Sequence, residues 1–158
     1  MRDVTVATKY DNWAHYRNQL TNACGSSKAV DFIVVVDSTL WLIEAKDYSE
    51  NPRIKSIEFS QELAQKARDT LMGIMCTRAY ASDRDEKRLA RDVMKFSKIR
   101  FALHLETRKH RNRLFPQPTN AADLSLKLRQ QLRFVDPHPI VFSRNSMHPA
   151  VPMVVELE

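Results

Sequence analysis

Two short apolar runs separated by a few polar residues constrain the fold of this chain more than any other feature. Residues 30–36 are mostly β-branched and apolar, and residues 40–46 form a second such run. Runs of this length and composition predict buried β-strands. Asp37, Ser38 and Thr39 between the runs suit a tight connection. The sequence therefore predicts a β-hairpin, and this hairpin decides which side chains lie next to each other.

The rest of the chain alternates between helical and strand-like patterns. Apolar residues at helical spacing predict a long helix over residues 56–80, with Glu62 and Lys66 as a supporting i, i+4 pair. Further helices are expected over 11–20, 83–98 and 121–132, strands over 100–107 and 139–143, and a loop over 22–28. This order predicts an α/β domain with a mixed central sheet flanked by helices.

Size and composition fit one domain spanning residues 1–158, with 43% hydrophobic residues. The first ten residues do not form an apolar signal segment. The apolar run 32–36 is too short to span a bilayer, so no membrane partner is expected. Cys24 and Cys76 form no C-x-x-C pair, which argues against a zinc ribbon or a disulfide framework. A reducing, cytoplasmic compartment is the expected location.

Glycine content and net charge narrow the function classes. Gly25 and Gly73 are the only glycines, which excludes a P-loop and a G-x-G-x-x-G turn, since both need several. The net charge of +6 and the sequence pI of about 9.5 favour a polyanionic partner, most commonly nucleic acid. Charge alone leaves an ordinary, mildly basic protein equally open.

The chemistry-bearing residues lie on the predicted hairpin. Side chains alternate along a strand, so Glu44 and Lys46 share one face of the second strand. If residues 37 and 38 form the turn, Asp31 lies opposite Glu44; if residues 38 and 39 form it, Asp31 lies opposite Lys46. A three-residue connection would send Asp31 to the other face. Both two-residue turns therefore predict two carboxylates and an ammonium group side by side.

This set of groups suits phosphodiester hydrolysis. Two close carboxylates repel each other, and a divalent cation removes that conflict. Oxygen ligands with open water positions suit Mg²⁺ or Mn²⁺. Such an ion can polarise a phosphate oxygen and lower the pKa of a bound water. Lys46 would orient that water or the phosphate and offset the developing charge.

The stretch VDFIVVVDSTLWLIEAKDY resembles the metal-binding hairpin of the PD-(D/E)XK nuclease superfamily, in which an acidic residue on one strand precedes an E-x-K signature on the next. Asp31 matches the first acid, and Glu44, Ala45 and Lys46 match the signature. The resemblance implies a restriction-endonuclease-like core and an Mg²⁺-dependent endonuclease. It implies that Asp31, Glu44 and the Ala45 carbonyl bind the metal ion. It also implies that Lys46 positions or activates the attacking water. It is specific over the hairpin and only topological over residues 10–107.

Two departures from the family pattern concern the surroundings of the site. The family's core has one more strand before the first acid, and residues 23–29 leave little room for it, so we expect it to be very short or absent. Many relatives also carry a Glu on the first helix, whereas no Glu precedes Glu44 in this chain. Asp11 is the acid close to that helix. It is a candidate further contact to the site, with a helix N-cap as the simpler role.

Several other residues are candidates for contacts around the site. Relatives often carry a Gln or Lys on the long helix, so Gln61 and Gln65 are candidates for supporting contacts, with a solvated helix face as the alternative. His104 and Glu106 share a strand face and are expected to satisfy each other. A basic run after that strand would contact the nucleic-acid backbone or form a solvated loop. Its members are Arg108, Lys109, Arg111 and Arg113.

These expectations combine into a metal-dependent nuclease, with DNA as the first choice of substrate. One alternative is a non-catalytic nucleic-acid-binding or assembly module with the same fold, because fold alone does not fix function. Another is a structure-specific junction resolvase, which would use the same site in a homodimer. A binding module has no need for an acidic pair facing a polyanion, which favours an enzyme.

Overall fold

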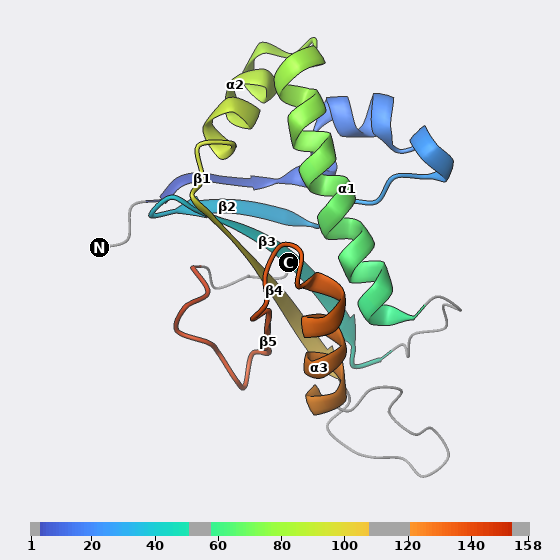
Figure 1. Cartoon of the computed structure of the whole chain (residues 1–158), viewed down its shortest axis with the longest axis vertical. Coiled ribbons are helices and arrows are strands. Elements are labelled where there is room, and N and C mark those ends of the chain that lie inside the picture. The colour runs from blue at the N-terminus through green and yellow to red at the C-terminus, as the bar shows by residue number, and fades with distance from the viewer. Residues whose placement is uncertain (1–3, 51–57, 108–120, 153–158) are drawn as a thin grey trace.

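The computed structural model describes residues 4–50, 58–107 and 121–152 and shows a mixed α/β fold (Figure 1). A five-stranded sheet runs in the order β1-β2-β3-β4-β5. Its strands are β1 (Val4–Lys9), β2 (Phe32–Val36), β3 (Thr39–Tyr48), β4 (Lys98–Thr107) and β5 (Ile140–Phe142). The helices are α1 (Phe59–Tyr80), α2 (Arg84–Val93) and α3 (Ala121–Leu132). The expected mixed sheet flanked by helices is therefore confirmed.

The hairpin of β2 and β3 has the first of the two expected registers. Val36 pairs with Thr39, so Asp37 and Ser38 form a two-residue turn. Both turn residues have positive φ, at 47° and 58°, which is the conformation of a type I′ hairpin turn. Such a turn matches the twist of the strands that it joins. The register therefore follows from turn geometry, and it places Phe32 opposite Ile43 at the far end of the ladder.

The sheet changes direction at β3. β1 and β2 are antiparallel, as are β2 and β3, whereas β3, β4 and β5 run parallel to one another. The chain passes from β3 to β4 through α1 and α2, because a parallel pair needs a long crossover connection. The carboxyl ends of β3 and β4 therefore meet at one edge of the sheet, where Tyr48 pairs with Thr107.

The N-terminal region differs from the expectation. Residues 23–29 hold no strand, as expected, but β1 supplies the additional antiparallel strand from the start of the chain. The expected helix over residues 11–20 is broken at Trp13, whose backbone is extended between a 3₁₀ turn at Tyr10–Asn12 and a π-helical turn at Tyr16–Leu20. Asp11 lies inside the first turn and Lys9 occupies the N-cap, so the expected capping role of Asp11 is wrong.

The two faces of the sheet are covered differently. The helices contribute to one apolar cluster with one face of the strands, as Leu63 of α1, Val93 of α2 and Leu128 of α3 show. On the opposite face, Trp41 and Ile43 pack with residues of the C-terminal segment that include Phe142 and Val151. The site described below lies on the helical face. None of the described helices is long and apolar enough to cross a bilayer.

Candidate active site

Asp31 is fixed against β3 although it lies just outside β2. The ladder between β2 and β3 ends at the pair of Phe32 and Ile43. One residue further, Oδ2 of Asp31 accepts a hydrogen bond of 2.8 Å from the backbone N–H of Ala45. The Asp31 carbonyl accepts another, of 3.0 Å, from the backbone N–H of Tyr10. The carboxylate thus takes the place of a ladder partner, and its position is determined by both neighbouring segments.

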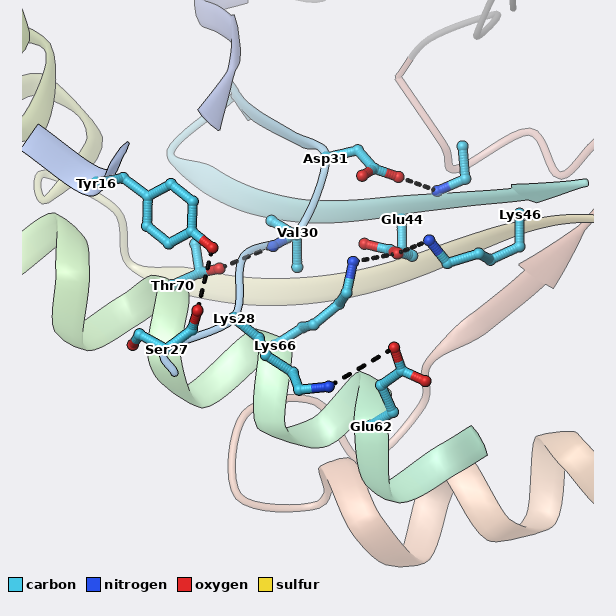
Figure 2. Close-up of polar contacts among 11 residues, drawn as sticks. Tyr16, Ser27, Lys28, Val30, Asp31, Glu44, Lys46, Glu62, Lys66 and Thr70 are labelled. Carbon is cyan, nitrogen blue, oxygen red and sulfur yellow. Dashed lines mark hydrogen bonds and ion pairs between the residues drawn. The ribbon is translucent and has the colours of Figure 1, made fainter. Parts of the chain in front are cut away.

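Glu44 is the most deeply buried member of the site, with no exposed side-chain surface. It follows Leu40 and Leu42 on the face of β3 that packs against the helices. Its Oε1 accepts from Nζ of Lys46 at 2.6 Å and from Nζ of Lys66 at 2.5 Å (Figure 2). Its Oε2 is buried and has no hydrogen-bond partner among the described residues. A buried carboxylate oxygen without a partner is costly, which marks this atom as a candidate ligand position.

The electrostatics of the site follow from this burial. Burial raises the pKa of Glu44, the nearby charge of Asp31 raises it further, and Lys66 and Lys46 oppose the rise. Burial by itself would lower the pKa of Lys46, but the charge and hydrogen bond of Glu44 outweigh it, so the pKa is raised. Lys46 therefore carries its positive charge at neutral pH. Asp31 is close enough to act on both groups, as two carboxylates around one ion require.

Lys66 of α1 is a site residue that the sequence analysis did not identify. It was expected to pair with Glu62 one helical turn away, but its ammonium group reaches across to the sheet and contacts Glu44. Glu62 instead lies 3.9 Å from Nζ of Lys28. Gln61 is exposed and Gln65 is half-buried on the same helix, and the ion pair from this helix to Glu44 is made by Lys66.

The segment leading into Asp31 is tied to α1 along its length (Figure 2). The backbone N–H of Lys28 donates to Oδ2 of Asp69 at 2.9 Å, and the N–H of Val30 donates to Oγ1 of Thr70 at 3.0 Å. The hydroxyl of Tyr16 donates to the carbonyl of Ser27 at 3.2 Å. These bonds hold irregular backbone in a fixed place. They explain how an acid outside any strand is held at a defined position beside β3.

The donors present fit a divalent cation bound by two carboxylates and backbone. The N–H of Ala45 points to the side of β3 where β2 has ended. Because the N–H and C=O of one strand residue point to the same neighbour, the Ala45 carbonyl faces Asp31 as well. Asp31, Glu44 Oε2 and this carbonyl are hard oxygen donors. The described residues contain no cluster of three or more His, Cys, Asp or Glu suited to a metal, so water or phosphate would complete the coordination.

The other candidate residues are Asp11, His104, Glu106 and the basic run. Oδ1 of Asp11 is buried without a described partner, and the neighbouring Tyr10 bonds to the Asp31 carbonyl. His104 pairs in register with Ala45 and so faces away from Glu44. Its Nε2 lies 3.0 Å from Oε1 of Glu106, which confirms the expected pairing, but its buried Nδ1 has no hydrogen-bond partner among the described residues. The basic run lies outside the described residues, with its members Arg108, Lys109, Arg111 and Arg113.

Comparisons with known proteins give limited information. No family model matches the chain, and no solved structure matches it. It is similar to a curated protein, the cysteine–tRNA ligase of Neisseria meningitidis serogroup A, at 31% identity over 147 residues. The match covers 74% of this chain and 21% of the ligase. The chain thus spans about a fifth of the length of that relative, and the likeness does not by itself assign the ligase's activity.

Proposed function

We propose that this protein is a metal-dependent nuclease that hydrolyses phosphodiester bonds of nucleic acid, with DNA as the first candidate substrate. The observation that carries the proposal is Glu44, a fully buried carboxylate that keeps one oxygen without a described partner beside Asp31 and Lys46. A buried acid in a purely structural role would be expected to satisfy both oxygens. An oxygen left open next to a second carboxylate suits a cation ligand.

The residues divide the work of hydrolysis between them. A bound Mg²⁺ or Mn²⁺ would polarise a phosphate oxygen and acidify a coordinated water. Asp31, Glu44 and the Ala45 carbonyl would hold the ion, since they present oxygen donors from two adjacent segments. Lys46 is 24% exposed and charged, so it can reach both the ion site and a substrate at the surface. It orients the attacking water and offsets the negative charge that grows on the phosphate.

The fold supports the proposal. The family resemblance calls for a helical segment, antiparallel strands, a further helix and another strand. In this chain β1, β2 and β3 follow one another and pair antiparallel. The connection through α1 then leads to β4, which is parallel to β3. A restriction-endonuclease-like core is therefore the finer description that we propose for the mixed sheet. A Mg²⁺-dependent endonuclease in the cytoplasm is the corresponding proposal for activity and location.

A second class of function keeps the fold without catalysis. A nucleic-acid-binding or assembly module would use the net charge of +6 and leave the acidic pair idle. In such a module Glu44 and Asp31 would add no favourable contact with a polyanion. A structure-specific junction resolvase is a variant of the proposed enzyme, and it would act as a homodimer. The assay below separates the non-catalytic module from both enzymes, and branched DNA separates the two enzymes.

The test is cleavage of defined substrates with and without Mg²⁺ or Mn²⁺. Supercoiled plasmid, single-stranded DNA, a four-way junction and RNA are offered to the protein and to Asp31→Asn. Because the curated relative is named as a tRNA ligase, tRNA belongs among the RNA substrates. The proposal expects cleavage products only in reactions that contain both the wild-type protein and a metal ion. Binding without cleavage of any substrate in both ions would instead establish the non-catalytic module.

A further inference from the structure

The strongest unexplained feature of the site is the placement of two ammonium groups on one oxygen. Lys46 and Lys66 both contact Oε1 of Glu44, at 2.6 and 2.5 Å, while Oε2 receives no described partner. Two like charges so close to one atom repel each other, and a single lysine would form the ion pair. A second cation from a different layer of the fold therefore calls for a separate explanation.

The charges of the cluster balance only in the absence of a metal ion. Asp31 and Glu44 supply two negative charges, and Lys46 and Lys66 supply two positive ones. A divalent ion would leave a surplus of two positive charges in a largely buried place. Buried charge without compensation is costly. Binding of the ion therefore favours the departure of one ammonium group from Glu44.

Lys66 is the group that can leave without disturbing the strand. It reaches Glu44 from α1, across the layer between helix and sheet, whereas Lys46 is on the same strand as Glu44 (Figure 2). The side chain is 13% exposed in Lys66 and 24% exposed in Lys46, so exposure does not by itself choose between them. A lysine has a flexible four-carbon stem, so its head can move toward water while the stem stays packed.

We propose that Lys66 is an internal counter-ion that compensates Glu44 before the divalent ion binds and competes with that ion for the site. This inference rests on the proposed function, since it requires a metal at Asp31 and Glu44. It makes Lys66 a positioning residue that sets metal affinity. It also assigns different roles to two lysines that contact the same oxygen.

Direct binding of Mn²⁺ tests the proposal without any substrate. Titration calorimetry compares wild type with Lys66→Met, which keeps the apolar stem and removes the charge. The variant is expected to bind Mn²⁺ about tenfold more tightly, because a unit positive charge no longer opposes the ion. Lys66→Arg keeps the charge and is expected to stay near the wild-type affinity. If Lys66→Met binds Mn²⁺ with unchanged or weaker affinity, the counter-ion role is wrong.

Lys28→Met is the matched control for general loss of positive charge. Lys28 points toward the same region but lies near Glu62, not Glu44, at 3.9 Å. Its affinity for Mn²⁺ is expected to stay within about twofold of wild type, since a more distant and more exposed charge is better screened. An equal gain in Lys28→Met and Lys66→Met would overturn the proposal, because any lysine in the area would then have the same effect.

The experiment separates failure of this inference from failure of the proposed function. Mn²⁺ binding that wild type shows and Asp31→Asn lacks supports the metal site itself. If that site exists and Lys66→Met does not tighten it, the counter-ion role alone is overturned. If wild type binds no Mn²⁺, or Asp31→Asn binds it equally well, both proposals are overturned. Circular dichroism and thermal unfolding without metal check that each variant is folded, and Lys66→Arg provides a readout even if Lys66→Met is unstable.

Discussion

The backbone N–H of Ala45 donates a 2.8 Å hydrogen bond to Oδ2 of Asp31, at a point where β2 has already ended. A side chain thus continues the hydrogen bonding of the strand pair for one more residue. This keeps the Asp31 carboxylate beside β3, within electrostatic reach of Glu44. The same bond makes Asp31→Asn a mild substitution, because the amide oxygen of Asn can accept from Ala45 in the same way.

The first prediction concerns stabilisation by metal. Mn²⁺ at a hundred times its Kd is expected to raise the Tm of wild type by about 5–10 °C, because it binds only the folded site. Asp31→Asn is expected to fold normally and to lose this rise. Asp47→Asn is the control, since Asp47 is an exposed carboxylate on the same strand and accepts from Ser49. Scanning fluorimetry measures all three. A rise that persists in Asp31→Asn would place the metal elsewhere.

The hairpin shows what local sequence can determine. Its strands and its turn depend on residues within a few positions of each other, and both registers open to sequence reasoning place Asp31 beside Glu44 and Lys46. The structure has the register in which Asp37 and Ser38 form the turn. The proposed ligands Asp31 and Glu44 follow from this register. β1 was not predicted, although Val4, Thr5, Val6 and Thr8 are β-branched strand formers.

Lys66 shows where local reasoning fails. Its spacing from Glu62 predicts an i, i+4 ion pair. Both carboxylates are buried, with side chains 1% exposed in Glu62 and 0% in Glu44, so burial does not choose between them. Lys66 contacts Glu44, and Lys28 lies 3.9 Å from Glu62. Nothing within a few residues of Lys66 reveals that β3 will lie across from it. The available signal was position: Lys66 follows Leu63 by three residues and so lies at the margin of the buried helical face.

The second prediction concerns the contact between α1 and the N-terminal turns, where the backbone of Tyr10 bonds to the Asp31 carbonyl. A Cβ on Gly73 would lie 2.1 Å from Oη of Tyr10 and 3.0 Å from Cδ1 of Leu20. Gly73→Ala is expected to lower the free energy of unfolding by about 1–3 kcal/mol through overpacking, despite a gain in helix propensity of roughly 1 kcal/mol. Urea unfolding measures the change.

Tyr10→Phe provides the control for this clash. The Tyr10 hydroxyl is buried and has no hydrogen-bond partner among the described residues, so its removal costs little. In the Tyr10→Phe background, Gly73→Ala is expected to lose at least about half of its destabilising effect, because the nearest atom is gone. Additive effects of the two substitutions would show that the close approach of Gly73 and Tyr10 does not limit this packing.

The third prediction concerns nucleic-acid binding by the basic run. The run follows Thr107 in the sequence, and Thr107 pairs with Tyr48 at the carboxyl end of β3. Its replacement by alanine is expected to weaken binding to any sequence and to flatten the salt dependence by about one unit for each lost phosphate contact. The substituted residues are Arg108, Lys109, Arg111 and Arg113.

Three surface arginines on α2 serve as the control for this prediction. Arg84, Arg88 and Arg91 are exposed on α2, which precedes β4 and therefore lies toward its opposite end. Their replacement by alanine is expected to leave the salt slope within about half a unit of wild type. Fluorescence anisotropy at several salt concentrations measures both sets. An unchanged slope after loss of the basic run would exclude it from the binding path.

The last prediction concerns Lys46. Lys46→Ala leaves Lys66 in contact with Glu44 at 2.5 Å, so the buried carboxylate keeps a counter-ion and the fold is expected to survive. Turnover of a cleaved substrate is expected to fall by about 10²–10³-fold, because Lys46 acts on charge that develops in the transition state. Affinity for the same substrate in Ca²⁺ is expected to stay within about threefold, since ground-state contacts change little. Single-turnover kinetics and anisotropy separate the two effects. Near-wild-type cleavage by Lys46→Ala would remove Lys46 from the catalytic set and make the non-catalytic module the leading hypothesis, because the E-x-K match would then reflect strand composition alone.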